Sequence, residues 1–357
     1  MQILRAVAAL VVVFSHCIRA YTIYQPQYMQ DLSHSWLSGS WLREGMAVGV
    51  DIFFVISGFI MVHVSKDHAE GRKTPGNFIW LRLKRIYPPY IVATLVLMGL
   101  VIAWSHSIPD DFNVWRIVLS VALIQSFNPN GLVQPILGTG WTLSYEMYFY
   151  LAFAAALAIG KRSYLAVLVV MITGGWLVSS AIYSYSALGV FFSNPIVFEF
   201  LFGCAIGYLY AVNKIPRVSS FIAALAVLFI CVVSHLNRSE LISDNWRFLY
   251  LGIPAAVIVT SALSWRVSGR VSNFFSFLGD ASYSIYLIHI VVIYQVMSRV
   301  YPKLISFGFV TSIDQAVAIT FIVATIGGIL FHLVVERQFN EWRKRTKKRA
   351  AERLVGA

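Results

Sequence analysis

Residues 3–21, ILRAVAALVVVFSHCIRAY, form an apolar block of the length that an α-helix needs to cross a bilayer, roughly 20 residues for a hydrocarbon core about 30 Å thick. Similar blocks recur along the rest of the chain. They do not alternate apolar and polar residues as the strands of a membrane barrel do. The sequence therefore predicts an all-α fold, a polytopic bundle of transmembrane helices.

The composition excludes the other broad classes of protein. Of the 357 residues, 58% are hydrophobic and only 12% are charged, against about 25% charged in a typical soluble domain. The mean hydropathy is +0.71. Such a chain cannot cover a water-facing surface with polar groups, and it is too apolar to remain disordered. Because no stretch is long and polar enough for a soluble domain, we expect one membrane domain over residues 1–340 and a basic tail over residues 341–357.

Ten segments have the length and hydropathy of a membrane span: residues 3–21, 46–64, 86–104, 141–160, 164–183, 195–212, 218–235, 248–265, 277–297 and 316–335. Residues 114–127 are apolar but short, and they contain Arg116 and Gln125. This segment spans the membrane, re-enters it or lies at its interface. The first block lacks the charged start and the cleavage site of a signal peptide, so we expect a retained helix.

Loop charge predicts the orientation. With ten spans and a cytoplasmic N-terminus, most of the 28 Lys and Arg residues lie on the cytoplasmic side, whereas an eleventh span would place the basic tail outside. We expect both termini in the cytoplasm and a tail lying against anionic lipid, in a bacterial cytoplasmic (inner) membrane. The net charge of +12 then reflects orientation and not nucleic-acid binding.

Cysteine and histidine usage predicts neither a disulfide framework nor a metal site. Cys17, Cys204 and Cys231 all fall inside apolar blocks. The 8 histidines are scattered and lack carboxylate or thiolate partners at ligand spacing.

Arg5 and His16 are the ionisable residues of interest in the first block, because charged groups at membrane depth usually face a cavity or a partner. They lie about three helical turns apart on one face, separated by about 16 Å along the axis. One interpretation is an anion site at the inner mouth and a proton acceptor deep in a cavity. The alternative is a snorkelling arginine and a hydrogen-bonded packing histidine.

Further polar residues mark the other spans. Arg82 and Arg85 share a helix face and either bind phosphate groups or anchor the loop on the cytoplasmic side. Glu146 and Glu199 each need a cation, a hydrogen-bond network or water, so each is catalytic or structural. Further candidates are Asp51 at the start of the second span, Ser57 near its middle, and the one-face stripe Ser282, Tyr286 and His289.

These segments together resemble acyltransferase family 3, integral membrane enzymes that acylate cell-surface polysaccharides and related glycans. The motifs that carry the resemblance cover nearly the whole chain and are, in order, Arg5-x10-His16, Phe53-Phe54-x-x-Ser57-Gly58, Arg85-Ile86-Tyr87-Pro88, Trp141-x-Leu143-x-x-Glu146-x-x-Phe149-Tyr150, Phe198-Glu199-Phe200-x-x-Gly203, and Ser282 to His289. The compact form is most similar to enzymes of exopolysaccharide production. The chain departs from the family pattern after Glu336, where the expected Pro is missing.

The resemblance implies transfer of an acyl group, most often acetyl, from acyl-CoA to a sugar hydroxyl, with Arg5 and His16 essential. Acyl-CoA is then a substrate and not a bound cofactor, and the partners are a polysaccharide or lipid-linked glycan and membrane lipid. We expect His16 to act as general base or as a nucleophile that carries the acetyl group. The remaining expected roles are catalysis for Arg5 and Glu146; donor binding for Arg5, Arg82, Arg85 and Ser57; and substrate binding for Asp51, Trp141, Tyr148, Glu199, Ser282, Tyr283, Tyr286 and His289.

Two other functions use the same intramembrane residues. One is a transporter or flippase for a glycolipid or small anion, although we find no pair of broken helices in repeated halves. The other is an acyl translocator that passes the acyl group to a separate transferase. The acceptor sugar, the acyl chain, the face on which the acceptor is met and the oligomeric state stay open.

Overall fold

A computed structural model describes residues 1–28, 45–160, 163–182, 185–236, 244–265 and 268–355. The described residues form helices joined by loops and contain no strand, only an isolated bridge between Phe127 and Val133. The predicted all-α class is confirmed. The bounds of the longer helices are α1 Gln2–Tyr28, α3 Val48–Val64, α5 Pro75–Ser105, α7 Gly140–Gly160, α8 Tyr164–Ala181, α10 Val197–Ala211, α11 Ser220–Leu236, α12 Ile253–Ala262, α13 Arg270–Gln295, α15 Ile313–Phe331 and α16 Arg337–Val355.

Short helices and three π-helical turns complete the fold. The short helices are α4 Lys66–Ala69, α6 Val114–Val121, α9 Ala187–Ser193 and α14 Tyr301–Ser306. The π turns are η6 Phe248–Gly252 before α12, η7 Val296–Val300 after α13, and η8 His332–Glu336 between α15 and α16.

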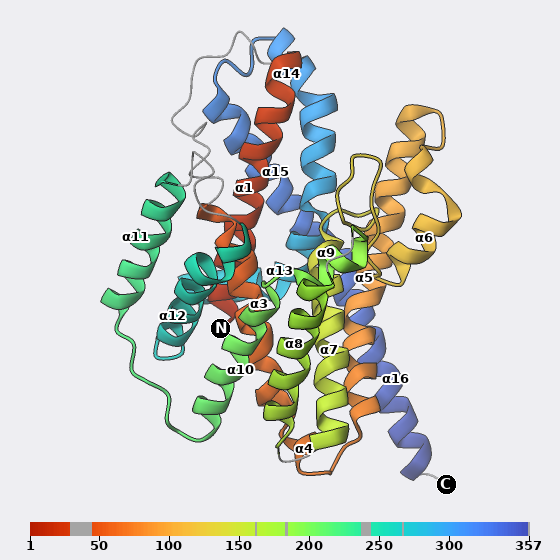
Figure 1. The fold of residues 1–357 in the computed structure, drawn as a ribbon. Helices are drawn as coiled ribbons and strands as arrows, with labels where there is room; N and C mark the ends of the chain where they lie inside the picture. The colour runs from red at the N-terminus through yellow and green to blue at the C-terminus, as the bar shows by residue number, and fades with distance from the viewer. Residues whose placement is uncertain (29–44, 161–162, 183–184, 237–243, 266–267, 356–357) are drawn as a thin grey trace.

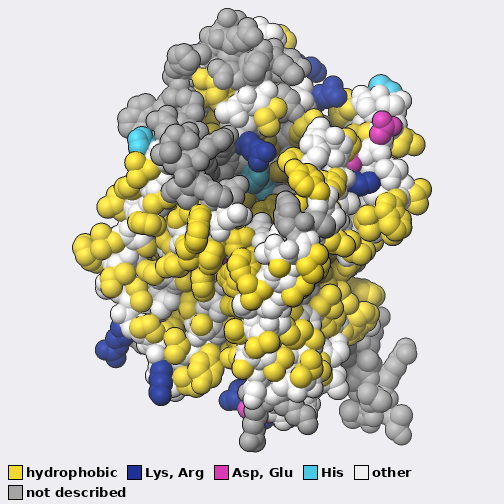
Figure 2. Space-filling model, viewed as in Figure 1, with side chains coloured by type: hydrophobic (Ala, Val, Ile, Leu, Met, Phe, Trp, Pro, Cys, Tyr) yellow, Lys and Arg dark blue, Asp and Glu magenta, His cyan; other side chains and the backbone are white. Residues whose placement is uncertain are grey.

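Each of the ten expected spans coincides with an apolar helix. In the described chain, 7 helices are long and apolar enough to cross a membrane, and three shorter ones cover Val48–Val64, Ser220–Leu236 and Phe248–Ala262. The protein is thus an integral membrane protein by its helices. Hydrophobic side chains cover most of the face shown in Figure 2, and Lys and Arg side chains lie along its lower edge and in its upper half.

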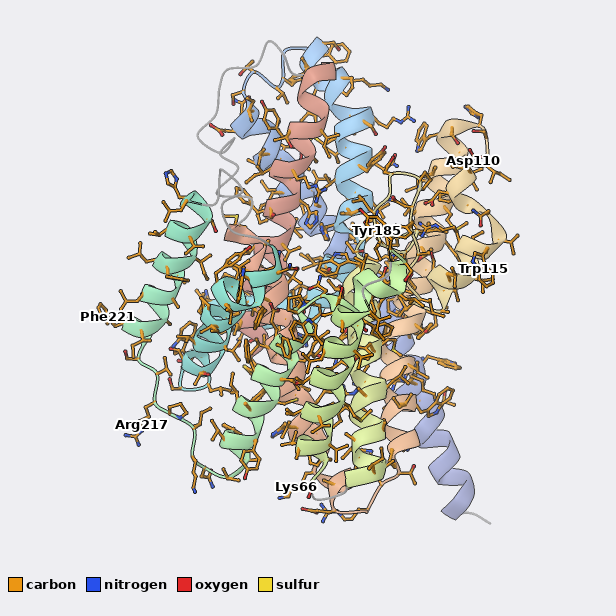
Figure 3. The ribbon with its side chains drawn as sticks, viewed as in Figure 1. Lys66, Asp110, Trp115, Tyr185, Arg217 and Phe221 are labelled. Atoms are coloured by element: carbon orange, nitrogen blue, oxygen red, sulfur yellow. The ribbon has the colours of Figure 1, made fainter. Side chains whose placement is uncertain are left out.

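Residues 114–127 do not form a spanning helix. Only α6 is helical there, and its 8 residues are about 12 Å long. Asn113 caps its start by accepting from the backbone N–H of Arg116 at 2.9 Å, and the chain turns after it at Leu123, whose φ is 57°. Trp115 of α6 is 69% exposed (Figure 3). The helix in this segment is therefore too short to cross a membrane by itself.

Helix α5 begins well before the expected span at residue 86. Thr74 caps it by accepting from the backbone N–H of Asn77 at 3.2 Å. The helix then runs without a break through Pro88 and Pro89. Because Pro88 has no N–H, the carbonyl of Lys84 loses its helical donor, and Arg343 of α16 donates to that carbonyl at 3.3 Å. Arg82 and Arg85 therefore lie on a helix and not in a loop.

Close helix contacts at glycine build the centre of the bundle. Helices α1 and α13 run in the same direction, since Gly279 packs on the backbone of Gln2 and His289 packs on His16 farther along. Helices α3 and α10 meet where Gly58 faces Gly203, and a Cβ at either position would overlap the other helix's backbone. This packing brings the start of α1 and the middle of α13 next to α3, where Arg5, Tyr283 and Tyr286 line one cavity.

Candidate active site

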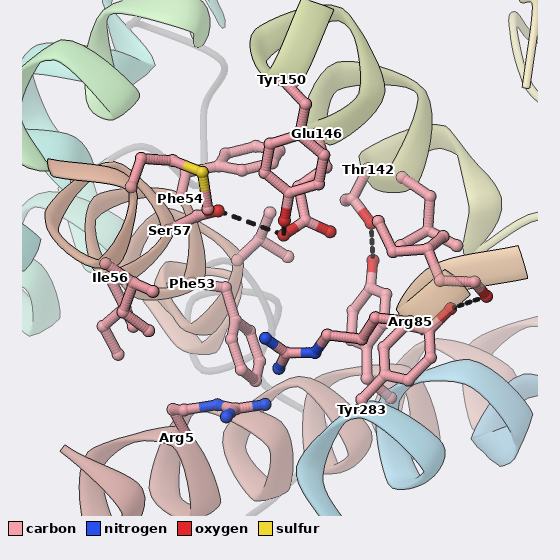
Figure 4. A pocket seen from close by; sticks show the side chains of 16 residues that line it. Arg5, Phe53, Phe54, Ile56, Ser57, Arg85, Thr142, Glu146, Tyr150 and Tyr283 are labelled. Atoms are coloured by element: carbon pink, nitrogen blue, oxygen red, sulfur yellow. Dashed lines mark hydrogen bonds between the residues drawn. The ribbon is translucent and has the colours of Figure 1, made fainter. Parts of the chain in front are cut away.

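A cavity lies where α1, α3, α5, α7 and α13 meet (Figure 4). About 780 Å³ of space between these helices is free of protein atoms, part of it open to the outside. The described residues that line it are Arg5, Val50, Phe53, Phe54, Ile56, Ser57, Ile60, Met61, Arg85, Ile86, Thr142, Leu143, Glu146, Tyr150, Tyr283 and Tyr286. Six of the predicted site residues thus come together: Arg5, Ser57, Arg85, Glu146, Tyr283 and Tyr286.

Glu146 links two helices across the cavity. Its Oε1 accepts from Ser57 of α3 at 3.1 Å and from the hydroxyl of Tyr150, one turn along α7, at 2.6 Å. The other carboxylate oxygen accepts no hydrogen bond from the described residues. It is therefore available to a donor on a bound molecule.

Two guanidinium groups face this carboxylate from other helices. Arg5 of α1 donates to Gln2 at 3.3 Å, and neither Arg5 nor Arg85 forms an ion pair with a described carboxylate. The described wall thus carries two positive charges and one negative charge. An apolar cavity with a surplus of positive charge favours the binding of an anion.

Arg82 lies outside the cavity wall. Its guanidinium is 5.7 Å from the ring centroid of Tyr150 and 5.3 Å from that of Phe78. It therefore sits behind Tyr150, where cation–π contacts hold it. The structure brings Arg85, and not Arg82, to the cavity surface.

His16 forms a pair with His289 of α13, and their ring centroids are 4.9 Å apart. The Nδ1 of His16 lies 2.9 Å from the carbonyl of Val12, and the Nδ1 of His289 lies 2.6 Å from the carbonyl of Tyr286. Since a carbonyl only accepts, each Nδ1 carries the hydrogen. In the neutral rings both Nε2 atoms keep their lone pairs. The Nε2 of His289 is buried and has no partner among the described residues.

Tyrosines of α13 connect the cavity with the histidine pair. Tyr283 donates to the carbonyl of Ile86 at 2.8 Å, and the Tyr286 hydroxyl lies 2.8 Å from that of Thr142. Ser282 is fully buried, and its hydroxyl has no partner in the described chain. Neither His16 nor His289 is among the described residues that line the cavity.

Asp51 and Glu199 lie apart from the cavity, in a buried ion cluster. Both are 0% exposed. Arg247 donates to Asp51 through Nη2 at 2.7 Å and Nε at 3.3 Å, and also donates to the carbonyl of Ala47. Glu199 packs against Gly252 and accepts no hydrogen bond from the described residues. This cluster joins α3, α10 and η6.

Trp141 and Tyr148 are not among the described residues that line the cavity. Trp141 packs edge-on against Phe54 and Tyr145. Tyr148 packs against Phe191 and Phe192 of α9. Because α7 carries the cavity on one face and α9 on another, both side chains support the wall from behind.

Sequence reasoning missed the cluster at η8. Glu336 Oε2 accepts from Ser284 at 2.6 Å and lies 2.8 Å from Nδ1 of His332. The four-residue spacing of His332 and Glu336 would have suggested their contact. The bond to Ser284 depends on how α13 packs, which spacing does not give.

Fold and site define a helical integral membrane protein with a cationic cavity next to a histidine pair. The chain belongs to the family of the acyltransferase domain, acyltransferase family 3, which matches residues 1–335. It is therefore an acyltransferase, of the family that includes O-acetyltransferases.

Three relatives show the range of the similarity. The exopolysaccharide production protein ExoZ of Rhizobium meliloti is 31% identical over 247 residues, 68% of this chain and 75% of ExoZ. The peptidoglycan O-acetyltransferase OatA of Listeria monocytogenes is 26% identical over 328 residues. The putative peptidoglycan O-acetyltransferase YrhL of Bacillus subtilis is 24% identical over 303 residues. The chain spans 51% of OatA and 45% of YrhL. No solved structure matches it.

Proposed function

We propose that the protein transfers an acyl group, most often acetyl, from acyl-CoA to a hydroxyl of an exopolysaccharide or other cell-surface glycan. The observation that supports this best is the cavity, whose wall carries Arg5 and Arg85. Directly behind its wall lies a histidine pair whose Nε2 atoms keep their lone pairs. The guanidiniums suit the phosphates of a CoA thioester. The name of ExoZ supports an exopolysaccharide acceptor over peptidoglycan, because ExoZ is matched over more of its length.

His16 acts as the general base in this proposal. The acceptor oxygen forms a bond to the thioester carbonyl carbon while its proton passes to Nε2 of His16. The C–S bond then breaks, and the thiolate takes that proton, which leaves an ester and free CoA. His289 packs against the His16 ring and positions it for this step. Glu146 offers its free oxygen to an N–H or O–H of a substrate.

The test is the release of free thiol from acetyl-CoA by the purified protein in the presence of an acceptor glycan. We expect His16→Ala to lower the rate by about 10²–10⁴-fold, which is what a positioned base contributes. His106→Ala is the matched control, because that side chain is exposed at the end of α5. A transporter would release no thiol, and a His16→Ala variant with the normal rate would disprove the assignment of the base.

The site of action in the cell is part of the same proposal. We place the protein in a bacterial cytoplasmic membrane with both termini in the cytoplasm, where acyl-CoA is found. Mass spectrometry of surface glycans from cells with and without the gene would identify the acceptor sugar. Unchanged glycan acylation would contradict the proposed acceptor class.

A further inference from the structure

The cavity and the histidine pair lie at successive levels along α1 and α13. At the first level, Arg5 and Tyr283 line the cavity. Tyr286 lines it one turn farther along, and His289 follows at a rise of about 4.5 Å. Since His289 contacts His16, the base lies just beyond the end of the cavity that Tyr286 forms.

A pair of aromatic rings stands between the two levels. Phe53 of α3 packs edge-on against Tyr286, with ring centroids 5.9 Å apart. On its far side Tyr286 contacts His289, with ring centroids 5.8 Å apart. A group that leaves the cavity toward His16 along α13 therefore passes these rings.

The two rings differ in how firmly they are held. Tyr286 is buried and is fixed by Thr142 of α7 at 2.8 Å and by the carbonyl of Thr139, the residue before α7, at 3.4 Å. Thr139 in turn donates to the carbonyl of Leu287 at 3.2 Å. Phe53 is only partly buried and has no polar anchor. Since the two rings are in contact, a group can pass toward His16 only if the Phe53 ring, the one without a hydrogen bond, turns aside.

We propose that Phe53 and Tyr286, which are in contact, close the cavity toward His16, that the Phe53 ring turns aside to let the acyl group pass, and that Phe53 thereby restricts the enzyme to short acyl chains. This inference rests on the proposed function and adds the substrate's chain length to it. The CoA portion stays with Arg5 and Arg85 in the cavity, and only the thioester end passes between the rings. An acetyl group needs little room beyond its carbonyl, whereas a longer chain collides with the Phe53 ring.

The experiment compares thiol release from acetyl-, butanoyl- and octanoyl-CoA for the wild type, Phe53→Ala and Phe53→Leu. In the wild type we expect kcat/KM to fall with chain length. In Phe53→Ala the octanoyl-to-acetyl ratio of kcat/KM should rise about tenfold or more, the effect of a few methylenes in a hydrophobic pocket. Phe53→Leu should give an intermediate ratio. If the alanine variant does not fold, the leucine variant alone tests whether the size of the side chain at position 53 limits the acyl chain length.

Ile60→Ala is the matched control, since Ile60 lines the cavity on the same helix but about two turns from Phe53. If enlargement anywhere in the cavity were enough, Ile60→Ala would raise the ratio as much as Phe53→Ala, and the passage would be disproved. A wild type that uses octanoyl-CoA as well as acetyl-CoA would overturn it too. So would an unchanged ratio in both Phe53 variants. These results leave the proposed function intact, whereas a wild type that releases no thiol from any acyl-CoA refutes both.

Discussion

At the scale of single residues, the cavity is organised by hydrogen bonds that converge on one carboxylate. Glu146 is the acceptor for both Ser57 and Tyr150, so it fixes one side chain from α3 and one from its own helix. Arg5 and Arg85 approach from two further helices without forming an ion pair to a described carboxylate. These hydrogen bonds hold the polar side chains of the wall in place, while both guanidinium groups stay unpaired with described carboxylates.

Replacing Glu146 tests this arrangement. In Glu146→Ala, two hydroxyls lose their acceptor, and we expect a loss of about 1–3 kcal/mol in the free energy of unfolding. Glu146→Gln keeps an oxygen at the same place and should lose less. Thermal unfolding in detergent measures both variants. Equal melting temperatures for the alanine variant and the wild type would contradict the role of Glu146 as a link between helices.

The two arginines of α5 form a matched pair for testing donor binding. Arg85→Ala removes a cation from the cavity wall, and we expect KM for acetyl-CoA to rise about tenfold or more, as for the loss of a charge-assisted hydrogen bond. Arg82→Ala should raise KM less, because its guanidinium lies behind Tyr150. Steady-state kinetics of both variants distinguish a residue that contacts the donor from one that only packs behind the cavity wall. An unchanged KM in Arg85→Ala would reassign that residue to membrane orientation.

Sequence reasoning found the residue types of the site but not their neighbours. Arg5, Ser57, Glu146 and Tyr286 stand out because polar groups are rare in apolar helices, and the structure does place them around one cavity. The same reasoning grouped Asp51 with them. The partner of Asp51 is Arg247, which is far away in sequence, and no local pattern specifies such a long-range contact.

At the scale of helices, the bundle depends on backbone contacts between helices that leave no room for a side chain. Gly58 and Gly203 let α3 and α10 touch through their backbones, and this contact aims Ser57 at Glu146 on the neighbouring face. The ion cluster of Asp51, Glu199 and Arg247 joins the same two helices to η6. These two contacts help to hold α3, and with it the cavity wall, in position.

A pair of glycine variants tests the close contact. In Gly203→Ala the new methyl group overlaps the backbone of α3, and we expect a loss of stability of about 1–3 kcal/mol or more. In Gly99→Ala nothing lies within 4 Å of the added Cβ, and alanine is the better helix former. That variant should be as stable as the wild type or slightly more so. Similar unfolding temperatures for both variants would argue against the packing of α3 on α10.

The ion cluster gives a separate test. Arg247→Leu leaves the carboxylate of Asp51 buried without a partner, and the expected loss is about 3–5 kcal/mol. In Asp51→Leu/Arg247→Leu no charge of that pair remains, so much of the stability should return. Denaturation of the two variants in detergent measures the difference. A double variant less stable than the single one would show that the pair is not coupled.

At the scale of the whole molecule, the basic segments gather at one end. Lys66 and Arg217 lie at the lower end of the structure as drawn in Figure 3, and Asp110 lies at the other end. Helix α16 runs toward the same lower end as Lys66 (Figure 1). This agrees with the charge asymmetry on which the predicted orientation rests.

Single cysteines would test the orientation directly. With Cys17, Cys204 and Cys231 replaced by Ala, a cysteine is introduced at Asp110, Lys66 or Arg217. A membrane-impermeant maleimide added to intact cells should label Asp110→Cys only. Labelling of the other two variants should require opened cells. The reverse pattern would place the basic end outside.

Much of this fold could be predicted from hydropathy, because each expected span coincides with an apolar helix. The bounds were less accurate where charged residues continue a helix beyond the bilayer, as at the start of α5. Hydropathy also gave no sign that α15 continues through η8 into α16. What holds that junction is a set of polar contacts between distant residues, including Ser284 with Glu336 and Arg343 with Lys84.

The π turn at η8 has a consequence for how related chains can vary in length. A π turn accommodates about one residue more than an α turn, so deleting a residue there would restore ordinary α-helical geometry. Because the turn absorbs that residue, the helix beyond such a deletion would keep nearly the same faces toward its neighbours. A deletion in the ordinary α-helix at the start of α16 would instead rotate everything beyond it by about 100° and turn Arg343 away from Lys84. Single-residue deletions should therefore be commoner in η8 than at the start of α16 among related sequences.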